Sequence, residues 1–145
     1  MRFETGCFAL PPDSAPERMK ERVKAKVPSA LVQVTSSRAA RNERLVEMLA
    51  EQTYRSGQTG ALLARSAEMD LLLRLAGTTQ IEDAILRCGA KDGERNLLIV
   101  RCRHGEMKRI EATVLKGLVR LPSKALVKKE LEVVERGALL NALRA

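Results

Sequence analysis

The chain has 145 residues, a typical length for a single domain that buries a hydrophobic core without disulfides or metal ions. It contains no Trp, one Tyr and two Phe, so aliphatic side chains must fill the core, and an RNA-binding sheet that stacks bases on many exposed aromatic residues is disfavoured. The formal net charge of +8 favours an acidic partner, with nucleic acid the first candidate, although basic residues interleaved with Glu and Asp are also typical of an ordinary solvated surface.

The three cysteines, Cys7, Cys88 and Cys102, are far apart and odd in number, which does not fit a secreted disulfide framework. The first residues form no apolar signal segment, and no run of about eighteen apolar residues is present to span a bilayer. We therefore expect a cytoplasmic protein with no membrane partner. Nothing in the sequence indicates self-association, so a monomer is expected.

Strands and helices alternate in the N-terminal half. Residues 2–8 and the alternating segment 30–35 are predicted to form strands, and residues 15–25 are predicted to form a polar helix after a Pro-rich connection. A long helix is predicted to begin behind Ser36 or Ser37 and to extend to about residue 54. This alternation is typical of an α/β domain.

Residues 66–89 are predicted to form two short helices joined by a turn. Ser66 is a suitable cap for the first helix, and Gly77 is the residue on which that helix can stop. Thr79 and Glu82 have the spacing of a capping box for the second helix. An apolar stripe is expected to place this second helix on the core, through Ile81, Ala84, Ile85 and Cys88. The turn between the helices leaves polar groups exposed and is a candidate recognition surface.

The C-terminal half begins with a strand over residues 96–102, whose LLIV centre is apolar on both faces and predicts a central strand. Amphipathic helices are predicted over residues 107–118 and after Ser123, with close packing at Gly137. In the last helix one apolar face is predicted, formed by Val127, Leu131, Val134 and Ala138 and widened by Val133, Leu139 and Leu140. The predicted fold is one α/β domain, residues 1–145, with a small mixed sheet flanked by several helices.

Catalytic groups are scarce. Cys102 and His104 would point to the same side of a strand, which a Cys–His nucleophile pair can use, but a buried thiol beside a surface imidazole fits the end of an apolar strand better. These two residues and Cys88 supply too few ligands for zinc. No phosphate-binding glycine loop is present. We therefore predict no enzyme activity, no cofactor and no metal, and a small cysteine-dependent enzyme is the alternative.

A first basic cluster lies at the predicted start of the long helix. Arg38 and Arg41 follow Ser36 and Ser37 there, although a helix start favours carboxylates over cations. Free backbone amides, hydroxyls and guanidinium groups together suit a phosphate group. The alternative is a set of plain surface arginines.

A second basic cluster surrounds the turn between the two short helices. Arg74 and Arg87 flank this turn, and Lys91 follows the second helix. Within the turn, Gln80 and Thr78 are placed to contact a base edge or a phosphate. A solvent-facing position in the first turn of the helix is the alternative for Gln80.

Two blocks of the sequence carry a resemblance. Residues 68–89 contain Leu71-Leu72-Leu73, Ala76-Gly77, Thr79-Gln80-Ile81 and Asp83-Ala84-Ile85, and residues 133–140 read VVERGALL. Together these blocks resemble the smallest subunit of the KEOPS complex, the PRPK-binding protein (TPRKB) family. The chain is also similar to this family in length and in the order of its elements.

The resemblance implies a non-catalytic adaptor. Members of the family bind the small lobe of the atypical PRPK-type kinase of KEOPS, the complex that completes threonylcarbamoyladenosine in tRNA, and they contribute to binding of the single-stranded tRNA CCA end. On this basis tRNA contacts are expected from Arg38, Arg41, Arg74, Thr78, Thr79, Gln80, Ile81, Arg87 and Lys91. Kinase contacts are expected from Val133, Ala138, Leu139 and Leu140.

One residue departs from the family pattern. Many relatives carry Arg immediately before the Gln-Ile pair, whereas this chain has Thr79, which puts a direct phosphate contact at this position in doubt. A neighbouring arginine can take its place. The alternative function is a protein-only scaffold of the kinase, without tRNA contact, whose positive charge serves solubility.

Overall fold

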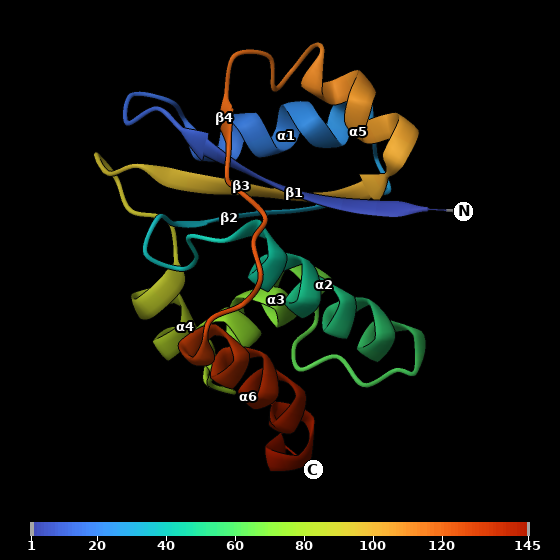
Figure 1. Ribbon diagram of the computed structural model, residues 1–145, viewed down its shortest axis with the longest axis vertical. Coiled ribbons are helices and arrows are strands. Elements are labelled where there is room, and N and C mark those ends of the chain that lie inside the picture. The colour runs from blue at the N-terminus through green and yellow to red at the C-terminus, as the bar shows by residue number, and fades with distance from the viewer. Residues whose placement is uncertain (1, 145) are drawn as a thin grey trace.

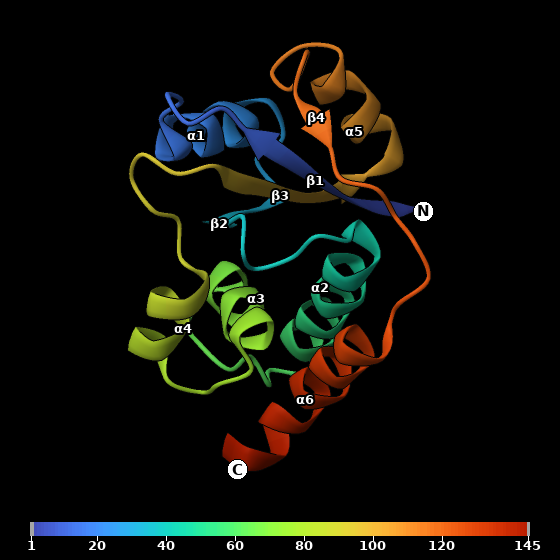
Figure 2. The ribbon, with the colours of Figure 1, turned by 60° about the vertical axis from the view of Figure 1, so that its left-hand side comes forward.

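The computed structural model describes residues 2–144, which form a sheet between two helical layers (Figures 1 and 2). In chain order the elements are β1 (Phe3–Leu10), α1 (Pro16–Lys26), β2 (Leu31–Ser36), α2 (Glu43–Gln58), α3 (Ala67–Ala76), α4 (Ile81–Cys88), β3 (Asn96–Arg103), α5 (His104–Glu111), β4 (Val119–Arg120) and α6 (Lys128–Arg144). Helices α1 and α5 cover one face of the sheet, and α2, α3, α4 and α6 lie on the other.

The strands are arranged in the order β2-β3-β1-β4. The predicted α/β class is confirmed, but every pair of neighbouring strands is antiparallel, so the sheet is not mixed. Strands β1 and β2 run in the same direction but are not neighbours, because β3 lies between them. This is the split β-α-β-β-α-β arrangement of ferredoxin-like domains, with α2, α3 and α4 inserted between the second and third strands and α6 added at the end.

Strand β3 is the central strand that the sequence predicted, and it contributes to two hydrophobic cores. Leu98 and Val100 pack with side chains of α1 and α5 on one face. Leu97 and Ile99 pack with side chains of α2, α3, α4 and α6 on the other face. Because successive residues of a strand point to opposite faces, a run that is apolar on both sides is needed here.

Helix α3 has the boundaries that the sequence predicted, whereas the start of α4 differs. The hydroxyl oxygen of Ser66 accepts a hydrogen bond from the amide of Met69 at 3.1 Å, and Gly77 ends the helix with a φ of 70°. The predicted Thr79–Glu82 capping box is wrong. The N-cap of α4 is Gln80, whose amide donates to the hydroxyl of Thr78 at 3.1 Å.

Three other helices have boundaries different from those predicted. Helix α2 begins at Glu43 because Asn42 caps it, its side-chain oxygen accepting from the amide of Arg44 at 3.1 Å. Helix α5 ends at Glu111, and the short strand β4, which the sequence did not predict, follows it. Helix α6 begins at Lys128 because the preceding residues are extended beside α2. The side chain of Asn42 holds them there, since it donates to the carbonyl of Lys124 and accepts from its amide.

Only part of the predicted apolar face packs against the rest of the protein. Val134 lies partly buried against the core, whereas Val127 and Leu131 are 61% and 46% exposed. The face that meets α2 and α3 also contains Gly137 and Leu140. The predicted close packing at Gly137 is confirmed, because an added Cβ would lie 2.6 Å from the Oε1 atom of Gln52.

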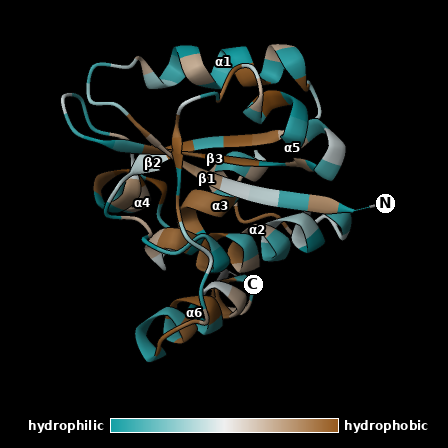
Figure 3. Cartoon of the chain, turned by 45° about the horizontal axis from the view of Figure 1, so that its top comes forward, coloured by the Kyte–Doolittle hydropathy of each residue, from teal (hydrophilic) through white to brown (hydrophobic). Residues whose placement is uncertain are grey.

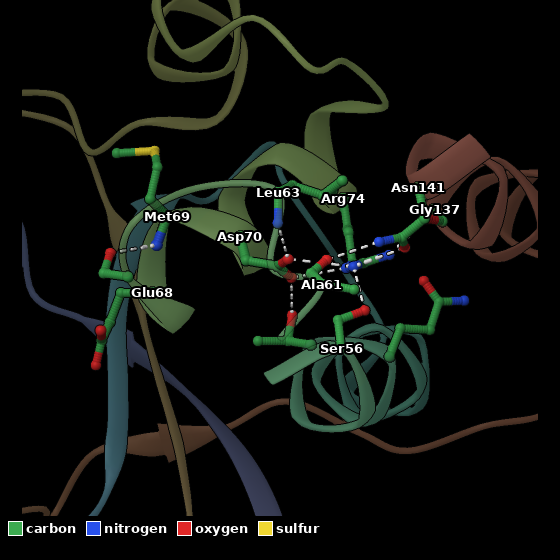
Figure 4. A network of polar contacts seen from close by, with 12 residues as sticks. Ser56, Ala61, Leu63, Glu68, Met69, Asp70, Arg74, Gly137 and Asn141 are labelled. Atoms are coloured by element: carbon green, nitrogen blue, oxygen red, sulfur yellow. Dashed lines mark hydrogen bonds and ion pairs between the residues drawn. The ribbon is translucent and has the colours of Figure 1, made fainter. Parts of the chain in front are cut away.

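A buried ion pair within α3 is hydrogen-bonded to α6. Arg74 is completely buried, and its Nε atom donates to the carboxylate of Asp70 at 2.7 Å (Figure 4). The other donors of the guanidinium group reach the carbonyl oxygen of Gly137 at 2.7 Å and the side chains of Ser56 and Asn141 at 2.9 and 3.0 Å.

Both oxygens of the carboxylate in this pair also accept hydrogen bonds. Asp70 is completely buried and accepts from the hydroxyl of Thr53 on α2 at 2.5 Å. Its second oxygen accepts from the amide of Leu63, in the connection between α2 and α3, at 2.9 Å. The Asp70–Arg74 pair therefore holds α2, α3, α6 and one loop together through hydrogen bonds to each of them.

No helix within residues 2–144 is long and apolar enough to cross a membrane.

The buried pair should contribute far more to stability than an exposed pair with the same spacing. The Asp70→Asn substitution leaves the guanidinium group of Arg74 buried without its counter-charge, which typically costs about 3–5 kcal/mol. The matched control is Asp83→Asn in α4, because Asp83 forms the same i, i+4 ion pair with Arg87 on the surface. The control should cost less than about 1 kcal/mol. Urea unfolding of both variants measures the difference, and equal losses would contradict the role given to Asp70.

Candidate nucleic-acid interface

The turn between α3 and α4 is fixed by backbone hydrogen bonds. The amide of Thr78 donates to the carbonyl of Leu73 at 3.2 Å, and the amide of Gly77 donates to that of Arg74 at 3.3 Å, the pattern of a Schellman motif. Gly77 is required there because its φ of 70° is unfavourable for other residues. The chain leaves α3 in a single direction, so the residues that follow are presented at a defined place.

This turn presents uncharged groups to solvent. Gln80 is exposed and its side chain forms no cap on α4, while Ile81 is 46% exposed. A hollow of about 760 Å³ lies against these residues, lined by Thr79, Gln80, Ile81, Glu82, Asp83 and Leu86. The two carboxylates in the lining repel a phosphate, so the hollow suits an unstacked base, which an amide can recognise by hydrogen bonds and an aliphatic side chain by contact.

Basic side chains approach this turn from α4 and α6. Arg87 donates to the carbonyl of Ala76 at 3.3 Å, and Arg136 donates to that of Gly77 at 2.9 Å. Both therefore neutralise the carboxyl end of α3. Together with Lys129 they line a groove of about 350 Å³ between the end of α3 and α6.

The structure contradicts the prediction that Arg74 contacts RNA. Its side chain lies in the buried ion pair with Asp70, and none of it is available to a ligand on the surface. Arg87 lies near the turn, as predicted, whereas Lys91 lies at the other end of α4. Lys91 is half-buried, and its ammonium group donates to the carbonyl of Leu86 at 3.0 Å, near the end of α4.

The predicted phosphate site at the start of the long helix is also contradicted. Arg38 and Arg41 are exposed in the connection before α2, whose first residue is Glu43. The amide of Arg38 donates to the hydroxyl of Ser36, and the start of α2 is already capped by Asn42. Neither arginine lines the hollow or the groove at the α3–α4 turn.

The predicted kinase-binding residues fall on different sides of α6. Leu140 is completely buried, so it is a core residue and cannot contact a partner. Val133 is half-buried and lines the groove, whereas Ala138 and Leu139 are exposed. Figure 3 shows several hydrophobic segments along α6. Two of the exposed ones were assigned to no partner by the sequence: Leu131 and Leu143 are 46% and 63% exposed, compared with 60% for Leu139.

Two functional candidates, Arg136 and Lys129, were missed by the sequence analysis. The Glu and Lys residues around them in the sequence are typical of an ordinary solvated helix. Only the packing of α6 against α3 brings them to the turn, since 59 residues separate Arg136 from Gly77. No local signal in the sequence could reveal that proximity.

A second polar cluster lies where β1, β4 and α5 meet. The guanidinium group of Arg120 forms ion pairs with Glu43 at 2.7 Å and with Glu4 at 2.8 Å. It also donates to the carbonyl of Thr5 at 3.3 Å, while Glu43 accepts from the amide of Cys7 at 3.0 Å. The exposed edge of β1 is therefore bonded to side chains where β4 does not reach it.

His104 belongs to this cluster and not to a thiol site. Its Nδ1 atom lies 2.5 Å from the carboxylate of Glu4. Cys102 is buried, and burial together with neighbouring carboxylates raises the pKa of its thiol to about 11. The nucleophilic thiolate is therefore a minor species at neutral pH, which weighs against the cysteine-dependent alternative. No three His, Cys, Asp or Glu side chains within residues 2–144 come together as metal ligands.

Comparison of the sequence with models of known protein families finds no match, and comparison with curated proteins finds no match either.

The Glu4 carboxylate should make stability depend on pH in the acid range. Its burial opposes ionisation, but hydrogen bonds from His104 and Arg120 outweigh this and lower the pKa of Glu4 below its usual 4.5. The stabilisation is fully present above pH 4.5 and is lost as the pH falls through the lower pKa of the folded state. The Glu4→Gln variant should lose about 1–2 kcal/mol at pH 7 and show a smaller further loss on acidification.

Urea unfolding at several pH values between neutral and strongly acidic conditions measures this difference. The matched control is Glu21→Gln, on the exposed side of α1, which leaves the cluster intact and should retain the acid dependence of the unmodified protein. An unchanged acid dependence in Glu4→Gln would show that the cluster does not contribute.

Proposed function

We propose that this protein is a non-catalytic adaptor subunit of a KEOPS-type tRNA-modification complex, which binds a PRPK-type kinase and the CCA end of tRNA. The resemblance of residues 68–89 and 133–140 suggests the family. The observation that carries the proposal is the exposed Thr79–Gln80–Ile81 turn, which lies at a hollow and next to a basic groove. Such an assembly acts in the cytoplasm, and its adaptor needs no cofactor.

The RNA side of the proposal rests on the chemistry of the turn. Single-stranded RNA ends present unstacked bases, which proteins recognise by hydrogen bonds to base edges and by contacts with flat or apolar side chains. Gln80 and Ile81 supply these two kinds of contact. The phosphates that accompany the bases require cations nearby, and Arg87, Lys129 and Arg136 line the adjacent groove. Arg136 therefore takes the part first given to Arg74.

The kinase side rests on the outer surface of α6. Leu139 and Leu143 are both more than half exposed on the final helix of the chain. Aliphatic side chains on one exposed helix face fit the apolar surface of a protein partner. This face is opposite the residues that pack on α2 and α3, so a partner can bind it without disturbing the core.

Binding of tRNA should depend on its CCA end. At low salt, intact tRNA should bind about tenfold more tightly than tRNA lacking CCA, and Gln80→Ala should remove most of that difference because it deletes the amide that contacts a base. Lys129→Glu should weaken binding of both RNAs and reduce the salt dependence, since one phosphate contact is lost. Titrations of labelled RNA at two salt concentrations measure these effects.

The control for charge is Lys116→Glu, in the exposed turn after α5, which changes the net charge equally but lies outside the groove. Equal affinity for the two RNAs would contradict CCA recognition, and the protein would then be a scaffold of the kinase alone.

Kinase binding should be lost when a charge is placed on the outer face of α6. The Leu139→Arg variant should bind a PRPK-type kinase at least about tenfold more weakly, because a central apolar contact is replaced by a charge that cannot be paired. Leu139 is 60% exposed, so the melting temperature should change little. The control is Val119→Arg, a residue of β4 that is 70% exposed. Calorimetric titration measures both, and retained affinity in Leu139→Arg would exclude this face.

A further inference from the structure

Two of the three aromatic residues of the chain lie together on the surface. Phe3, at the start of β1, is 41% exposed, and Tyr54, near the end of α2, is 37% exposed. Only Phe8 is buried in the core. In a chain with so few aromatic side chains, two of them exposed at one place form a surface that the core does not require.

The two rings are held by one arginine. The Cζ atom of Arg101, on β3, lies 4.4 Å from the ring centroid of Phe3 and 4.4 Å from that of Tyr54, and the two centroids are 5.7 Å apart. Arg101 is only 9% exposed, and its Nη2 atom pairs with Glu51 at 3.2 Å. The ion pair with Glu51 therefore holds the guanidinium group of Arg101 in place. Its contacts with the rings of Phe3 and Tyr54 arrange both rings before any ligand binds.

This aromatic–arginine cluster, formed by Phe3, Tyr54 and Arg101, borders a basic hollow. The hollow has a volume of about 600 Å³. Its charged lining consists of four arginines and two carboxylates, and Phe3 lies beside them: Arg2, Arg44, Arg55, Arg101, Glu47 and Glu51. Arg44 pairs with Glu47 at 3.0 Å, and Arg55 pairs with Glu51 at 3.7 Å. These exposed ion pairs contribute little energy, so both arginines can turn to an anion that enters the hollow.

We propose that this hollow binds a nucleotide unit, with the base against the exposed ring of Phe3 and the phosphate at one of the exposed arginines, Arg44 or Arg55, that line the hollow. Aromatic faces next to a basic groove are the combination that binds single-stranded nucleic acid without sequence preference. The nucleotide can be a free mononucleotide or one unit of an RNA strand. The site shares no lining residue with the α3–α4 turn or the groove beside it, so it does not depend on the function proposed above.

The fluorescence of Tyr54 provides an intrinsic probe of binding at this site. Because the chain has one Tyr and no Trp, its ultraviolet fluorescence comes from Tyr54 alone. A base that enters beside the cluster should quench this emission to saturation. Titrations of the full chain with adenosine 5′-monophosphate, adenosine, inorganic phosphate and a short single-stranded oligoadenylate RNA test the proposal, with absorption by the ligand corrected against free tyrosine amide.

We expect the monophosphate to bind more tightly than adenosine or phosphate alone. The Phe3→Leu variant should raise its apparent Kd about fivefold or more, since base stacking is lost while an apolar side chain remains. The double variant Arg44→Gln with Arg55→Gln should reduce the monophosphate to the affinity of adenosine. The matched control is Arg18→Gln on α1, an exposed arginine outside the hollow, which should change neither value.

The source of the nucleotide follows from the two phosphorylated ligands. An oligonucleotide that binds much more tightly than the monophosphate indicates an RNA strand, and similar affinities indicate a free nucleotide. The absence of saturable quenching by any ligand would overturn the proposal, and so would equal affinities for the monophosphate and inorganic phosphate. If Phe3→Leu does not fold, as judged by circular dichroism, the double arginine variant still decides the result. None of these outcomes changes the expected difference between tRNA with and without its CCA end.

Discussion

The helical layer that contains α2, α3 and α6 depends on the buried ion pair between Asp70 and Arg74. A guanidinium group that is removed from water must satisfy its donors, and here it does so only when α2, α3 and α6 are all in place. Displacement of α6 would leave those donors unpaired in a region of low dielectric, which is costly. A buried pair of this kind adds less net stability than an equally packed apolar core, but it discriminates strongly between one helix register and the next. The position of α6 is thus decided by hydrogen-bond geometry as well as by apolar contact.

The shape of the surface proposed to bind RNA depends on this ion pair, because the pair positions α6 against α3. Arg74 donates to the carbonyl of Gly137, and the neighbouring residue, Arg136, donates to the carbonyl of Gly77 at the end of α3. Both arginines therefore hold α3 against α6, Arg74 through a buried hydrogen bond and Arg136 through an exposed one. The absence of a side chain at Gly137 lets α6 approach closely enough for both. The groove and the turn are formed before a ligand arrives, so little conformational entropy needs to be lost on binding.

Features that depend on neighbouring residues in the chain could be predicted from the sequence. The cap at Ser66, the stop at Gly77 and the central strand around Leu98 follow from local preferences and alternation, and the structure has all three. Features decided by contacts between distant residues could not. Arg74 resembles a surface residue in its sequence context, and only its three-dimensional contacts show it to be buried. The start of α2 at Glu43 follows from the local cap of Asn42 on the amide of Arg44, which the prediction overlooked in favour of Ser36 or Ser37. The bonds of the same side chain to Lys124, 82 residues away, had no signal in the sequence. The same reasoning predicted the turn after α3, which the structure has, and missed the proximity of Arg136 to it.

The side-chain bonds along β1 have a consequence for how this protein meets other molecules. An unpaired strand edge is a template on which another chain can add a strand, whether a partner peptide or a second copy of the same protein. On β1 the carbonyl of Thr5 is bonded to Arg120 and the amide of Cys7 to Glu43, and the carbonyl of Cys7 accepts from the amide of Leu121. Two charged side chains thereby occupy the positions that an incoming backbone would need. Strand addition and edge-to-edge aggregation are therefore blocked along this part of β1.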